Sequence, residues 1–168
     1  MIDRMKNIKY KLGFSLAELL IALAIAAMLL VAVAVAFNAS ATNYQQNEDI
    51  FKVVNSARQA LCRITSQLRT ANAVYPIAPI NECSFFTSTG QDITYRYNNV
   101  DNKLYLITNY DLTDSDYVLC DNVTAMTFTK TPTDDGLDCK SVQISITVAS
   151  DDVEKTISAA AAIRRNLN

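Results

Sequence analysis

Four cysteines are the residues of this sequence that could support covalent chemistry, and no histidine accompanies them. Without histidine, the chain lacks the commonest general base, the Ser-His and Cys-His nucleophile pairs and most zinc sites. An even number of cysteines is instead typical of two disulfides in an oxidising compartment. We therefore expect disulfides rather than catalysis. The alternative is four buried free thiols at Cys62, Cys83, Cys120 and Cys139.

Two acidic clusters could offer oxygen ligands to calcium. Neither cluster has the spacing of an EF-hand loop, and solvated turns rich in Asp are commoner than calcium sites. We therefore predict no metal site and no cofactor. The clusters are Asp111, Asp114 and Asp116, followed by Asp134, Asp135 and Asp138.

Charge is distributed unevenly along the chain. The net charge is -2, and the first thirteen residues carry +3 through Arg4, Lys6, Lys9 and Lys11 against Asp3. The remainder therefore carries -2 - 3 = -5. An acidic body argues against nucleic acid as a partner, because phosphate binding requires clustered Lys and Arg.

An apolar segment from Phe14 to Phe37 follows the basic start and contains neither Gly nor Pro. As a helix, its roughly 24 residues extend about 36 Å, which is enough to span a bilayer. The segment is therefore expected to be one unbroken helix that contacts membrane lipid. Positive charge before the segment predicts a cytoplasmic N-terminus and an extracytoplasmic body.

Glu18 is the exception within this apolar segment. A carboxylate at the centre of a membrane helix costs about 2.5–3.5 kcal/mol on insertion scales unless it has a partner. The helix itself offers no cation. A simple signal anchor explains the apolar length but leaves Glu18 unexplained.

The residues Lys11-Leu-Gly-Phe-Ser-Leu-Ala-Glu-Leu-Leu20 resemble the class III signal sequence of type IV prepilins. The resemblance implies cleavage between Gly13 and Phe14 by a dedicated membrane peptidase and N-methylation of the new terminal Phe14. It also implies that Glu18 pairs with the N-terminal ammonium of a neighbouring subunit, where a paired charge is tolerable in a low dielectric.

The same resemblance implies a structural subunit rather than an enzyme. Its implied partners are the prepilin peptidase, other pilin or pseudopilin subunits and an inner-membrane assembly platform. The precursor would cross the inner membrane once, and the mature chain would enter a cell-surface or periplasmic filament.

Beyond the apolar segment, apolar residues recur at steps of three and four from Ile50 to Ala71, which predicts that the helix continues to about Ala73. Tyr75–Pro79 is expected to be a loop. Alternating patterns then predict an antiparallel sheet, so the fold class is α+β, a long helix packed on a β-rich domain. The expected strands are Ser84–Ser88, Ile93–Tyr97, Lys103–Thr108, Asp116–Cys120, Val123–Thr131, Ser141–Ala149 and Glu154–Ile163.

Four segments follow from these patterns: a leader over 1–13, a membrane or filament-core helix over 14–37, an amphipathic continuation over 38–74 and a β-rich domain over 75–168. The strand order and the ending Ala162-Ile-Arg-Arg-Asn166 resemble PilW-like and J-type minor pilins. That resemblance implies a minor subunit near the filament tip. A major pilin is the alternative, and so is a signal-anchored extracytoplasmic binding domain.

The four cysteines can pair in three ways. Pairing each cysteine with its neighbour in the sequence favours Cys62–Cys83 and Cys120–Cys139. The second pair would enclose a C-terminal loop as in many type IV pilins. However, a regular hairpin of 123–131 with 141–149 places Cys120 and Cys139 roughly 25–30 Å apart. A disulfide needs Cα atoms within about 7 Å. Either the hairpin is irregular or the pairing differs.

Overall fold

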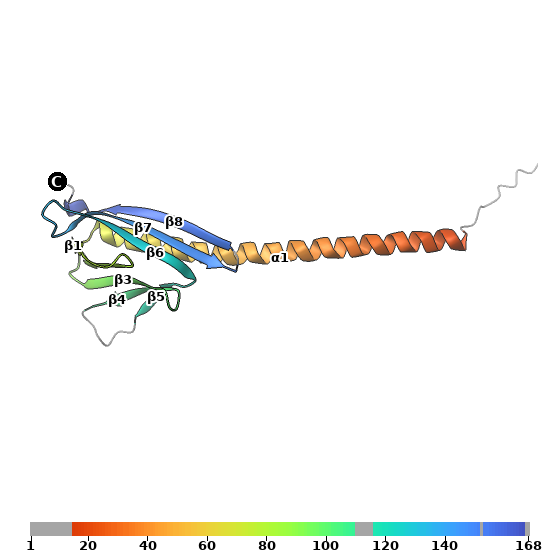
Figure 1. Cartoon of the computed structure of the whole chain (residues 1–168), viewed down its shortest axis with the longest axis horizontal. Helices are drawn as coiled ribbons and strands as arrows, with labels where there is room; N and C mark the ends of the chain where they lie inside the picture. The colour runs from red at the N-terminus through yellow and green to blue at the C-terminus, as the bar shows by residue number, and fades with distance from the viewer. Residues whose placement is uncertain (1–14, 110–115, 152, 167–168) are drawn as a thin grey trace, which may run out of the picture. The chain divides into compact units, whose positions relative to one another are not determined.

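The computed structural model describes residues 15–109, 116–151 and 153–166. The chain forms two compact units, residues 1–44 and 45–168. One helix, α1 (Leu16–Arg69), supplies most of the described part of the first unit and the beginning of the second (Figure 1). The α+β class is confirmed: a long N-terminal helix packs against antiparallel sheets.

Helix α1 is continuous because its 54 residues include neither Gly nor Pro. It ends at Arg69 rather than at about Ala73. Its last turn tightens, since the N–H groups of Thr70 and Ala71 donate to carbonyls three residues back, each at 3.2 Å. The Asn72 N–H then donates to the Phe86 carbonyl at 2.9 Å, and this bond directs the chain into a strand.

Two antiparallel sheets form the β-rich part, where the sequence predicts one. The first has the order β1-β2-β3-β4-β5, and the second has the order β6-β7-β8. The chain passes from one to the other at Asn122, whose φ of 55° lies in the left-handed region that Asn tolerates. The strands are β1 (Ala73–Val74), β2 (Glu82–Phe86), β3 (Asp92–Asn98), β4 (Lys103–Thr108), β5 (Tyr117–Cys120), β6 (Val123–Pro132), β7 (Cys139–Ser150) and β8 (Val153–Ala162).

One hydrophobic core joins both sheets to the second half of α1. The helix contributes Ala57, Leu61, Ile64 and Leu68, all buried and all on the predicted apolar face. The alternation predicted for 142–148 is present, since Val142, Ile144, Ile146 and Val148 are fully buried and Gln143 is exposed. The other large buried side chains include Phe85, Tyr95, Leu104, Val123, Phe128 and Ile163.

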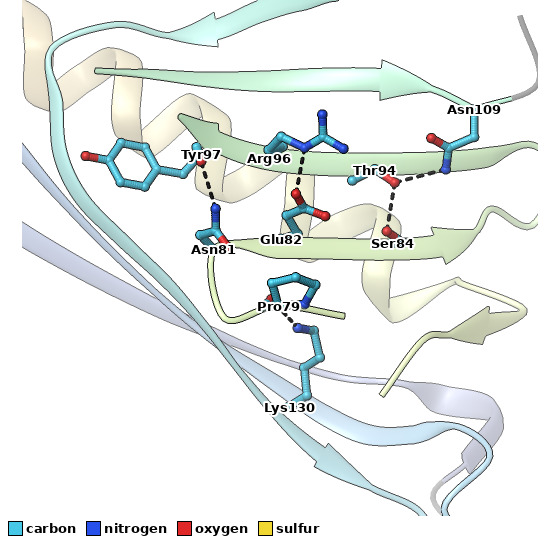
Figure 2. A network of polar contacts seen from close by, with 9 residues as sticks. All are labelled: Pro79, Asn81, Glu82, Ser84, Thr94, Arg96, Tyr97, Asn109 and Lys130. Carbon is cyan, nitrogen blue, oxygen red and sulfur yellow. Dashed lines mark hydrogen bonds and ion pairs between the residues drawn. The ribbon is translucent and has the colours of Figure 1, made fainter. Parts of the chain in front are cut away.

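Polar contacts connect the loop after β1 to the strands around it (Figure 2). The Lys130 ammonium on β6 donates to the carbonyls of Ala78 at 2.8 Å and Pro79 at 2.9 Å. The Phe128 N–H donates to the carbonyl of Ile80 at 2.7 Å. The predicted loop over 75–79 is therefore irregular but anchored to β6 by both a side chain and the backbone.

Candidate functional site

The first unit presents an apolar helix surface that nothing in the described chain covers. Every residue of α1 from 16 to 44 is exposed. By length and composition, α1 is the one helix in the described part of the chain that could cross a membrane. Burying such a surface in lipid or among neighbouring helices is strongly favourable, since each fully buried Leu or Ile side chain contributes about 1.5–3 kcal/mol.

Ser15 and Glu18 form a reciprocal cap at the start of this helix. The Ser15 N–H donates to Glu18 Oε2 at 2.9 Å, and the Glu18 N–H donates to Ser15 Oγ at 3.2 Å. This is a capping box, which satisfies two of the N–H groups that a helix start leaves without partners. The carboxylate also lies at the positive end of the helix dipole. Glu18 therefore has a local partner in addition to any partner in a filament.

Sequence reasoning missed the role of Ser15, although the Ser-x-x-Glu spacing was a usable signal. Gly13 and Phe14, the residues of the expected cleavage site, lie outside the described residues. The first described residue, Ser15, directly follows Phe14. A new N-terminus at Phe14 would thus be adjacent to Ser15, whose N–H donates a hydrogen bond to Glu18.

Comparison with known families gives one match, to the prokaryotic N-terminal methylation motif over residues 8–34. The matched segment includes Gly13, Phe14 and Glu18. The chain carries the signal of a type IV prepilin. No curated protein and no solved structure matches the chain.

This prepilin motif supports a precursor of the type IV pilin or pseudopilin type. It implies processing by a prepilin peptidase and assembly with other pilins. Together with the exposed apolar helix, the motif is consistent with a membrane-anchored precursor. It also favours a structural subunit over an enzyme.

The β6–β7 register separates Cys120 from Cys139, two cysteines that are neighbours in the order of the sequence. Cys139 lies opposite Pro132, at the turn of the hairpin, whereas Val123 at the other end pairs with Val148. Cys120 precedes Val123 by three residues. Since nine residues of strand extend about 30 Å, this register is incompatible with a Cys120–Cys139 disulfide.

Cys62 and Cys83 also lie in different surroundings. Cys62 is exposed on α1, whereas Cys83 on β2 is completely buried. Burial raises the pKa of the Cys83 thiol to about 12, while nearby Lys130 lowers it and the Cys139 thiol raises it. Burial likewise raises the pKa of Cys139 to about 11. Cys83 and Cys139 therefore share one electrostatic neighbourhood, which includes Lys130.

Two aspartates of the second acidic cluster, Asp135 and Asp138, accept hydrogen bonds from groups of this chain. Asp135 Oδ1 accepts from the Thr133 hydroxyl at 2.5 Å, and this bond lowers the pKa of Asp135. Asp138 Oδ1 accepts from the Val74 N–H at 2.8 Å, which joins the β6–β7 turn to β1. Within the described residues, no group of three or more acidic, cysteine or histidine side chains is arranged to hold a metal. Asp111 and Asp114 lie outside those residues.

Proposed function

We propose that this prepilin is a structural subunit of a type IV pilus or a type II secretion pseudopilus, and not an enzyme. In this proposal it is a minor subunit near the tip that initiates assembly. The observation that carries the proposal is the methylation motif at residues 8–34, which continues into a helix with its apolar surface exposed all round.

Cleavage between Gly13 and Phe14 would remove a basic leader and create an ammonium on Phe14. That cation would be one residue from Ser15, whose N–H already bonds to Glu18. In the proposed filament, apolar helices exchange lipid for one another, and Glu18 pairs with the methylated ammonium of a neighbour. Such a pair offsets the cost of a carboxylate in an apolar environment.

The minor position is supported by features of α1. Many major pilins have a helix-breaking Pro in the second half of this segment and a Gly before it, and this helix has neither. Glu18 is present, whereas the extreme tip subunit of pseudopili usually lacks it. A position just below the tip accommodates both features, with the domain over 75–168 facing outward.

The deciding experiment is the N-terminal mass of the protein purified from membranes of cells with and without the prepilin peptidase. We expect a chain that begins at methylated Phe14 in the first case and an intact Met1 in the second. An intact Met1 in cells with active peptidase would contradict the proposal and leave a signal-anchored domain.

Two alternatives have distinct signatures. A major pilin would dominate shed filaments by mass, whereas a minor subunit would be a trace component. A signal-anchored extracytoplasmic binding domain is favoured by one observation: the cap with Ser15 gives Glu18 a role that needs no neighbour. Such a domain would remain uncleaved and would tolerate loss of the Glu18 charge.

A further inference from the structure

A basic groove lies within the second unit, between residues 58–70 of α1 and the C-terminal segment. It consists of two hollows of about 430 and 300 Å³ that share Cys62 and Thr65. Three arginines line them, Arg69 and Arg164 in the larger and Arg58 in the smaller. We name this surface the arginine groove.

The charge of the arginine groove is not neutralised within the described chain. Neither hollow has an Asp or Glu in its lining. The ion pairs among the described residues involve Lys52, Arg96 and Lys140, and none of them includes a groove arginine. Yet the chain beyond residue 13 has a net charge of -2 - 3 = -5. The groove is thus a cationic site on an acidic subunit, and it would attract carboxylates.

The fold assembles the groove from distant segments. Arg164 belongs to the short helix η1 (Arg164–Asn166), which follows β8. The adjacent Arg165 holds this end against the helix terminus, since its Nη1 donates to the Asn72 carbonyl at 2.9 Å. Arg58 and Arg69 are exposed on α1. Guanidinium groups suit this role because their planar donor fork matches a carboxylate in two-point contact.

The adjoining sheet edge is open. β8 pairs with β7 on one side, and in the described chain no strand pairs with its other side. Glu154 and Lys155 place charges at the beginning of this strand, which protects an edge against pairing. The part that lines the groove, Ile157–Ala159, and the alanines after it have no charged side chain. An extended segment could therefore add to the edge there through its backbone.

We propose that the arginine groove and the adjoining edge of β8 bind an extended acidic segment of a neighbouring filament subunit. The arginines select for carboxylates, and the edge selects for an extended backbone. This inference rests on the proposed function, because it assigns one contact between subunits of the filament. It concerns the globular part and is independent of the contact made by Glu18.

The test uses the full-length chain in assembled filaments. A photoreactive benzoylphenylalanine replaces Ser66, an exposed residue of the larger hollow, and a matched control places it at the exposed Gln143 of β7. We expect the Ser66 probe to crosslink a neighbouring subunit within a segment that contains at least two carboxylates. The Gln143 probe should not reach that segment.

Charge removal gives the second readout. The double variant R58Q and R69Q should lower the crosslink yield by about fivefold or more, because two guanidinium partners are lost. K52Q removes an exposed cation from α1 outside the lining of both hollows and should leave the yield unchanged. All variants change exposed side chains, so unfolding temperatures should match that of the wild type.

Three results would overturn the inference: crosslinking of the Ser66 probe to lipid, crosslinking to a segment without carboxylates, or an unchanged yield in the double variant. A chain that carries the Ser66 probe and is otherwise wild type, and that enters filaments without forming a crosslink, would refute this inference alone. A chain that never enters filaments would refute the proposed function as well.

Discussion

Glu18 and Ser15 cap each other, with the Ser15 N–H 2.9 Å from Glu18 Oε2 and the Glu18 N–H 3.2 Å from Ser15 Oγ. The Glu18 carboxylate can therefore contribute in two ways, through a hydrogen bond and through its charge. Its oxygen accepts a hydrogen bond that an uncharged amide could also accept, and its charge can pair with an ammonium. Because the two differ chemically, substitutions can remove one and keep the other.

The first prediction concerns the charge of Glu18. E18Q keeps an oxygen that can accept from the Ser15 N–H, since Gln also serves at this position of a capping box. Membrane insertion and leader cleavage should therefore remain at the wild-type level. Incorporation into filaments should be lost in E18Q and E18A alike, because neither can pair with an ammonium. Immunoblots of membranes and of sheared filaments measure both quantities.

S15A is the matched control for the cap. It removes the hydroxyl acceptor at a cost of about 1 kcal/mol in local helix stability but keeps the carboxylate. We expect S15A to be cleaved and incorporated. Normal incorporation of E18Q would refute charge pairing and leave the cap as the function of Glu18.

The second prediction concerns the cysteines. Since the β6–β7 register places Cys120 and Cys139 at opposite ends of a hairpin, no peptide linking them should appear in a non-reducing digest. In an oxidising compartment, the pair expected to be linked is Cys83 with Cys139, because both thiols are buried, both act on Lys130, and Cys139 acts on Cys83. Mass spectrometry with and without reductant identifies the linked peptides. A link between Cys120 and Cys139 would show that the hairpin register is wrong.

Periodicity predicted the elements whose residues alternate between core and solvent. Burial of one face produces a regular spacing of apolar residues, which can be read from the sequence. Examples are the alternation from Val142 to Val148 and the helical stripe that contains Leu61 and Ile64. The class III signal was equally visible, because its residues are contiguous.

Contacts between segments that are distant in the sequence produce no such local pattern and could not be predicted. β1 is two residues long and depends on pairing with β2 and on the bond from the Val74 N–H to Asp138, 64 positions away. The chain passes between the two sheets at Asn122, whose φ of 55° does not follow from any periodic pattern. The arginine groove unites α1 with η1, and no local pattern connects Arg69 to Arg164.

The third prediction concerns Lys130. K130M keeps most of the apolar stem but removes the donors to the carbonyls of Ala78 and Pro79. Hydrogen bonds to charged groups contribute about 1.5–3 kcal/mol, so the free energy of unfolding should fall by about that amount. Urea unfolding of the full-length protein in detergent measures it. K155M, on an exposed lysine without an ion pair, should change stability by no more than about 0.5 kcal/mol. Equal stability of both variants would show that the loop over 75–79 is held by other contacts.

The last prediction concerns alkaline pH and the reduced protein. Burial raises the pKa of Cys83 from 9.0 to about 12, and burial also raises the pKa of Tyr95 from 10.0 to about 12. Between pH 9 and 12, the unfolded chain has lost the Cys83 proton while the folded chain retains it. The folded state then binds more protons, so its stability must fall as pH rises. The full contribution of the Cys83 thiol to the free energy of unfolding is present below pH 9 and is lost as pH approaches 12.

Urea unfolding with reductant at pH 8 and pH 10.5 should therefore show a decrease in the free energy of unfolding that is smaller in C83S, which lacks the titrating thiol. C62S, altered at an exposed site, should retain the wild-type decrease, and an identical decrease in C83S would exclude Cys83 as a source of the pH dependence.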